Sequence, residues 1–176
     1  MSVPVSWVLA QPDLALRLRG GAAGVTRAVD LALTSELASP FRWLSGGELL
    51  LTTGIRLPST TADRVAYLRG LDDCKVAAVG FATGLTHDEV PRDLIEAADE
   101  IGIPLVEVPL KTPFAAVVKR VSARLAELQY DAVIRASRAQ PKMTRTAISG
   151  GAPAIIQQLA RTLKSNVLIL DATGEP

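Results

Sequence analysis

The strongest constraint on this fold is an alternation of apolar runs with helical stripes in the first 110 residues. Two runs, Val76–Phe81 and Ile103–Val108, are almost continuously apolar, with Glu107 as the one charged residue, which is typical of strands buried on both faces. Two further predicted strands precede them, at Val29–Thr34 and Glu48–Thr53. Strands buried on both faces indicate a parallel sheet that is covered by helices.

Helical patterns lie between the last three of these strands. One stripe stops near Gly70, and a second stops before Gly102; they comprise Ala62, Val65, Leu68 and Leu71, and then Leu94, Ile95, Ala98 and Ile101. Thr86 and Glu89 form a capping-box pattern ahead of the second stripe. Residues 1–112 are therefore predicted to form an α/β domain with a mostly parallel sheet and crossover helices.

A long helix is predicted over residues 113–140, ending at Gln140 and Pro141. Its apolar residues recur at alternating spacings of four and three, a heptad-like seam: Phe114, Val118, Val121, Leu125, Leu128 and Ala132. Two interpretations stay open. Either the first half packs on the domain and the rest is a solvated connector, or the helix dimerises and transmits a signal. The second interpretation predicts dimer contacts at Val118, Val121, Leu125 and Leu128.

Residues 141–176 are predicted to begin a second domain. Ser149–Gly151 has the composition of a loop, Pro153–Leu163 of an amphipathic helix, and Asn166–Asp171 of a strand. One helix and one strand cannot bury a core alone. We therefore expect the opening of a second domain that is truncated, or one that borrows strands from elsewhere.

The net charge of +1 conceals two regions of opposite sign. Residues 1–110 carry nine Lys and Arg against 14 Asp and Glu, whereas residues 111–165 carry ten against two. The basic region leaves open a contact with nucleic acid phosphates, although a solvated helix face is the alternative. Aromatic residues make up 4% of the chain and offer few platforms for base stacking.

Composition also bounds compartment and chemistry. One cysteine and one histidine allow neither an internal disulfide nor a cysteine-rich zinc site, and no apolar run is long enough to span a membrane. A cytoplasmic protein without membrane contact is expected. The sequence holds no phosphate-binding loop, no metalloprotease motif and no nucleophile elbow, so we expect no enzyme, cofactor or metal. An unusual enzyme using Glu36, Glu48 and Arg56 is the weaker alternative.

The densest group of polar residues follows the second predicted strand: Thr52, Thr53, Gly54 and Arg56. The carboxyl ends of parallel strands face the usual ligand crevice, and Glu36 and Phe81 end neighbouring strands at that edge. These six residues form the predicted ligand site. The alternative is structural, because threonine suits strands and glycine suits turns. Glu48 begins its strand at the opposite end, which favours a structural role.

Several segments together resemble the N-terminal domain of the purine catabolism regulatory protein (PucR) family of bacterial transcription regulators. The most specific is Gly46–Gly54, reading Gly-Gly-Glu-Leu-Leu-Leu-Thr-Thr-Gly; the others are Val5–Leu14, Arg19–Gly24, Thr34–Leu37, Glu89–Ala98, Gly102–Leu105 and Pro109–Phe114. The resemblance covers residues 5–128.

This resemblance implies a cytoplasmic regulator whose N-terminal domain senses a metabolite or transmits a signal. It supplies no catalytic residues. Residues 152–171 resemble the start of the family's middle domain, a sensor-like α/β domain. The family's DNA-binding helix-turn-helix lies after that domain, so DNA contact is expected only through a part outside this chain. We expect a homodimer with a purine-pathway metabolite as effector. A ligand-free dimerisation or scaffold module is the alternative.

Overall fold

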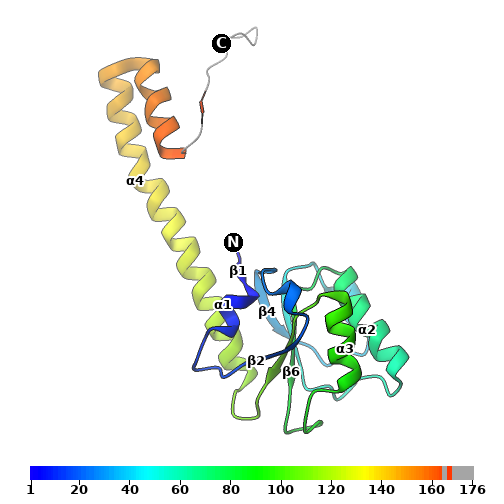
Figure 1. Ribbon diagram of the computed structural model, residues 1–176. Helices are drawn as coiled ribbons and strands as arrows, with labels where there is room; N and C mark the ends of the chain where they lie inside the picture. The colour runs from blue at the N-terminus through cyan, green and yellow to red at the C-terminus, as the bar shows by residue number, and fades with distance from the viewer. Residues whose placement is uncertain (164–165, 168–176) are drawn as a thin grey trace. The chain divides into compact units, whose positions relative to one another are not determined.

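A computed structural model describes residues 1–163 and 166–167, and its core is a five-stranded sheet (Figure 1). The strand order is β2-β7-β6-β5-β4. Strands β4 to β7 are parallel, and β2 pairs with β7 in the antiparallel sense. The predicted α/β fold with a mostly parallel sheet is confirmed. The strand bounds are β2 Arg17–Gly20, β4 Leu31–Thr34, β5 Glu48–Thr52, β6 Ala78–Ala82 and β7 Leu105–Val108.

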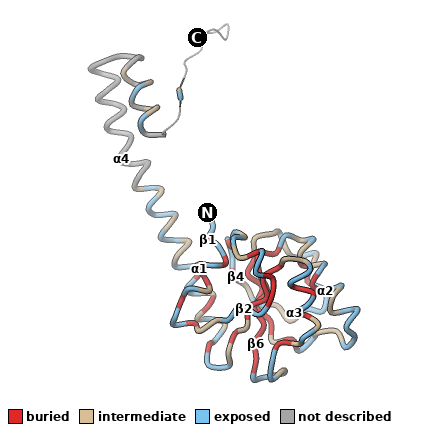
Figure 2. The backbone as a smooth tube through the Cα atoms, in the orientation of Figure 1, coloured by how far each residue is buried: buried red, intermediate tan, exposed pale blue. Residues whose placement is uncertain are grey.

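Helices cover both faces of the sheet. Helices α2 (Thr61–Asp73) and α3 (Arg92–Ile101) pack on one face, where Leu50, Val79 and Leu105 lie side by side on adjacent strands. The other face is covered by α1 (Val5–Leu9) and by the beginning of α4 (Phe114–Leu163). Buried residues therefore concentrate along the strands (Figure 2). The remaining short elements are β1 Val3–Pro4, β3 Ala28–Val29, η1 Ala22–Gly24 and η2 Phe41–Trp43.

Both predicted helical stripes lie in helices, α2 runs three residues beyond Gly70, and α3 ends before Gly102 as predicted. Helix α2 begins where Thr60 accepts a hydrogen bond from the Asp63 N–H (3.2 Å), and α3 ends at Gly102 in the left-handed conformation (φ 76°). The capping-box prediction is wrong, because α3 begins at Arg92 after Pro91. Residues 83–91 form a loop in which the Gly84 N–H donates to the His87 carbonyl (2.8 Å).

Two strands were not predicted, and one prediction is divided. The expected strand Val29–Thr34 is two strands, with β3 pairing with β1 and β4 joining the main sheet. Strand β2 has two arginines among its four residues, so its own pattern does not show burial. It joins the sheet because it pairs with β7.

Helix α4 continues beyond the residues that were predicted to end it. It is assigned from Phe114 to Leu163, so the predicted helix end at Gln140 and Pro141 and the predicted loop at Ser149–Gly151 are wrong. Proline and glycine lower helix propensity without forbidding a helix when their neighbours are good helix formers. The predicted strand Asn166–Asp171 lies mostly outside the described residues. Two compact units divide after Ala126.

The first turns of α4 belong to the core of the first unit. Val117 and Val121 are 0% exposed, and the Thr112 hydroxyl donates to the Leu14 carbonyl (2.8 Å). Arg120 donates to the Gln11 side chain (3.0 Å). Val121 is thus a core residue of the single chain, and a dimer contact through its side chain is not supported. The other three residues predicted to dimerise are partly exposed: Val118, Leu125 and Leu128.

We predict that Val121→Asp destabilises the chain far more than Leu125→Asp. A charge at the buried position loses its hydration, so the free energy of unfolding falls by about 3 kcal/mol or more. Half-exposed Leu125 loses only part of its apolar burial, about 1 kcal/mol. Urea unfolding followed by circular dichroism measures both. Equal losses would contradict the seating of α4 in the core.

Candidate functional site

A carboxylate bridges the ends of β4 and β5 at the carboxyl edge of the sheet. Glu36 lies two residues beyond β4, and its Oε2 accepts a hydrogen bond from the Thr52 hydroxyl (2.9 Å). Its Oε1 accepts from the Thr53 backbone N–H (2.7 Å). The Thr52 hydroxyl oxygen also accepts from the Gly54 N–H (3.1 Å). Glu36 therefore fixes the backbone where β5 ends.

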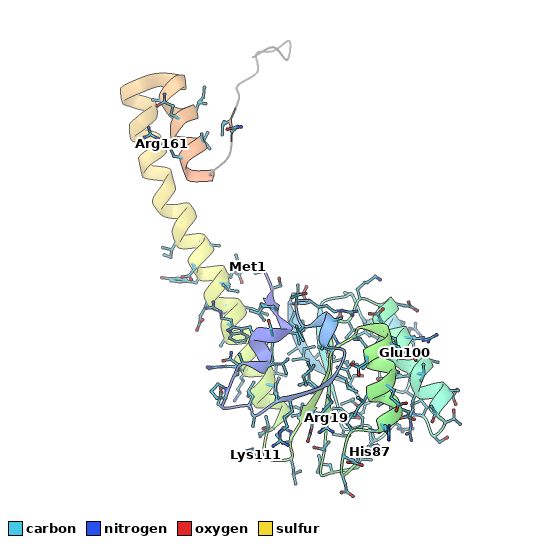
Figure 3. The ribbon with its side chains drawn as sticks, viewed as in Figure 1. Met1, Arg19, His87, Glu100, Lys111 and Arg161 are labelled. Atoms are coloured by element: carbon cyan, nitrogen blue, oxygen red, sulfur yellow. The ribbon has the colours of Figure 1, made fainter. Side chains whose placement is uncertain are left out.

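Gly54 lies at this edge in close contact with the rings of Phe81 and His87. Its φ is 73°, and a Cβ at that position would lie 2.6 Å from the Phe81 ring. The His87 ring packs on Phe81 with centroids 5.2 Å apart, and its Nε2 lies 3.2 Å from the Gly54 carbonyl oxygen. Figure 3 shows His87 at the end of the sheet where β6 finishes. Partly buried His87 is thus held against the end of the sheet by Phe81 and Gly54.

A small cavity lies beside Glu36, here called the Glu36 cavity. Its volume is about 10 Å³, and its lining residues are Glu36, Leu37, Thr52, Gly54, Arg56, Leu57 and Tyr67. A space of this size holds about one water molecule. Burial, and secondarily the negative charge of Glu36, raises the pKa of Tyr67 from 10.0 to about 12. The phenol therefore stays protonated at neutral pH and can donate or accept a hydrogen bond.

The six predicted ligand residues converge, although in different roles. Glu36, Thr52, Gly54 and Arg56 line the same cavity. Thr53 contributes a backbone N–H to Glu36, and Phe81 is buried behind Gly54. Sequence reasoning missed Tyr67, because it lies outside the apolar stripe of α2 and belongs to no motif. The binding role of all six remains a prediction.

The other end of β5 is held by a second carboxylate. Glu48 is 3% exposed and accepts hydrogen bonds from the Ser45 N–H (2.7 Å) and the Gly46 N–H (3.0 and 3.1 Å to its two oxygens). Gly47 has φ 85°, and a Cβ there would lie 2.7 Å from the Asp30 carboxylate. The Gly46–Gly54 block thus contains the hydrogen-bonding residues that fix both ends of β5. The structural interpretation of Glu48 agrees with this geometry.

The described part of the chain offers residues for neither a metal site nor a membrane-spanning helix. Within it, no group of three or more His, Cys, Asp or Glu side chains is placed to hold a metal ion. No helix among the described residues combines the length and apolar composition needed to cross a bilayer.

Comparisons with known proteins agree with this architecture. The model of the purine catabolism regulatory protein-like family matches residues 7–125, which ends one residue before the boundary of the first compact unit. The transcriptional activator PmfR of Paenarthrobacter nicotinovorans is 31% identical over 126 residues, covering 72% of this chain and 27% of that protein. The purine catabolism regulatory protein of Bacillus subtilis (strain 168) is 24% identical over 155 residues, covering 88% of this chain and 29% of that protein.

The α/β unit with its core-seated helix is therefore of the kind found in regulators of transcription. The chain belongs to the purine catabolism regulatory protein-like family. It spans less than a third of the length of either relative.

We predict that Glu36→Gln lowers the pKa of Tyr67 below about 12 but leaves it above 10.0, because burial is the larger cause and persists. The measurement is the phenolate absorbance during an alkaline titration. Both titrations are made in a Tyr130→Phe background, which removes the other tyrosine of the chain so that the absorbance reports Tyr67. An unchanged titration in Glu36→Gln would contradict the proximity of the two groups.

The same shift sets a pH dependence of stability. The pKa of Tyr67 is about 12 in the folded chain and 10.0 when it is unperturbed, so the unfolded chain ionises first as the pH rises. The free energy of unfolding therefore falls between pH 10.0 and about 12. We expect Tyr67→Phe to remove this part of the slope, as measured by urea unfolding at several pH values. An identical slope in both proteins would argue against it.

Proposed function

We propose that this chain is the signal-receiving part of a cytoplasmic transcription regulator, with no catalytic activity. The first unit binds a purine-pathway metabolite at the Glu36 cavity and passes its state to α4. The observation that carries this proposal is the hydrogen-bonded orientation of Glu36 beside a cavity that is also lined by two exposed side chains, Leu37 and Arg56. The named function of the Bacillus subtilis relative supports the ligand class.

The chemistry of the cavity favours a ligand rich in N–H groups. A carboxylate offers about four acceptor positions, and Glu36 uses one on each oxygen for Thr52 and Thr53. The remaining positions accept N–H groups of a purine or of a product of its breakdown. The Tyr67 hydroxyl and the Arg56 guanidinium supply further polar contacts. Because the cavity holds about one water, Arg56 and Leu37 have to move outward when a ligand enters.

A chain of contacts leads from this edge to α4. The Gly54 carbonyl meets His87, and the His87 carbonyl accepts from the Gly84 N–H (2.8 Å). Gly84 approaches Leu110 so closely that a Cβ on it would lie 3.1 Å from the Leu110 Cβ. Leu110 precedes α4 by four residues. A displacement of Gly54 on ligand binding therefore reaches the helix through the loop that carries His87.

We predict that xanthine, urate or allantoin raises the thermal midpoint by about 5 °C or more at saturating concentration, and that Glu36→Gln abolishes the shift. Differential scanning fluorimetry measures both. Glu100→Gln is the matched control, since this exposed carboxylate lies at the far end of α3. Absence of stabilisation by every compound would refute sensing at this cavity.

A second variant separates binding from transmission. His87→Ala removes the ring between Gly54 and the loop while leaving every lining residue of the cavity in place. We expect metabolite binding within about threefold of the parent. Transcriptional response of a full-length regulator carrying this chain should be lost. A normal response would exclude the relay through His87.

Dimerisation through α4 is the second proposed function, alone or together with sensing. The observation in its favour is that Leu125 and Leu128 are only half-buried in the single chain, although they continue the stripe of fully buried Val121. Leu125→Ser with Leu128→Ser should convert dimers to monomers in light scattering without unfolding the first unit. A monomeric parent protein would rule out this role.

A further inference from the structure

A larger hollow lies at the opposite end of the strands, here called the Arg27 groove. Its volume is about 350 Å³, and its lining residues are Arg27, Ala28, Gly47, Asp72, Lys75, Val76 and Ala77. This volume falls within the usual range for small-molecule sites, unlike that of the Glu36 cavity. The groove exists because three lining residues, Ala28, Gly47 and Ala77, have small or no side chains. Val76 and Ala77 are buried beneath it, and exposed Ala28 supplies an apolar part of its wall.

The walls of the groove carry two cations and one anion. Arg27 Nη1 donates to Asp72 Oδ1 (2.6 Å) and to the Val76 carbonyl (3.2 Å), which holds the guanidinium in one orientation. Among the described residues, the Nε and Nη2 atoms of Arg27 make no hydrogen bond, and Lys75 makes no ion pair. With Asp30, whose carboxylate lies beside Gly47, the groove and its rim carry two cations and two anions, and the N–H groups of Arg27 and Lys75 are its unused donors.

Lys75 occupies a backbone position that favours glycine. It follows α2 with φ 63°, where its N–H donates to the Asp72 carbonyl and its carbonyl accepts from the Gly47 N–H (both 2.8 Å). Glycine takes this left-handed conformation after helices without strain. Packing does not require a lysine here, because its side chain is exposed. The strained residue places an ammonium group at the mouth of the groove.

We propose that the Arg27 groove binds a small organic monocarboxylate. Its carboxylate lies between the free edge of the Arg27 guanidinium and the Lys75 ammonium, and its apolar body rests on exposed Ala28. A planar guanidinium edge matches a carboxylate. This site is separate from the Glu36 cavity, which lies at the other end of the strands.

Benzoate is a suitable probe, and benzamide is its neutral control of similar shape. In amide NMR spectra of the full chain, benzoate at about 10 mM should shift the signals of Gly47, Lys75 and Val76 more than those of Thr53 and Gly54. Benzamide should leave them in place. Equal shifts with both compounds, or none with benzoate, would overturn the proposal. Shifts confined to Thr53 and Gly54 would assign the anion to the Glu36 cavity and overturn it equally.

Two variants of Lys75 distinguish the effect of its charge on binding from the effect of its backbone conformation on stability. Lys75→Gln should weaken benzoate binding by about fivefold, the scale expected of one exposed charge pair. Lys75→Gly should weaken it to the same degree while raising the thermal midpoint, because the strain is relieved. Arg69→Gln, on the exposed surface of α2, should change neither quantity. Unchanged benzoate affinity in both Lys75 variants would exclude the proposed site.

Discussion

A parallel sheet has to be covered on both faces, and this requirement determines how the first unit is built. Helices α2 and α3 are the crossovers of the strands and cover one face. The other face receives no crossover helix, so α1 and the first turns of α4 cover it. Val117 and Val121 are fully buried for this reason. The helix that leaves the unit is therefore part of its core, and it cannot shift without repacking that face.

Each end of β5 is held by a hydrogen-bonded carboxylate, and the two carboxylates differ in their exposure to solvent. At its start, Glu48 is buried and hydrogen-bonded to backbone N–H groups of a turn, so its role is structural. At its end, Glu36 is held by Thr52 and Thr53 but remains half-exposed beside a cavity. A carboxylate that is oriented by the protein and still reachable from solvent is prepared for a ligand. The strand β5 is thus bordered by one buried carboxylate at its start and by one solvent-accessible carboxylate at its end.

The sequence predicts the elements whose signals lie within a short segment. It misses the strands and contacts that depend on residues far apart in the chain. The apolar runs of β5 to β7 and the glycine that ends α3 carry their own signals, and all appear in the structure. Strand β2 shows no burial pattern because pairing with β7 creates it. The placement of Tyr67 beside Glu36, and of Arg27 beside Asp72, requires residues 31 and 45 positions apart to meet. Such contacts follow from the topology of the sheet rather than from spacing along the sequence.

Helix α2 connects the two hollows of the unit. Its Tyr67 lines the Glu36 cavity and its Asp72 lines the Arg27 groove, only five residues further on. A helix transmits displacement along its axis with little internal deformation, so an occupant of one hollow alters the other through the same rigid element. Thermodynamic linkage makes that influence reciprocal, whichever ligand binds first. Under the two binding proposals, the unit combines an N–H-rich ligand and a carboxylate into one response. Its core already includes the beginning of the helix that would carry the response onward.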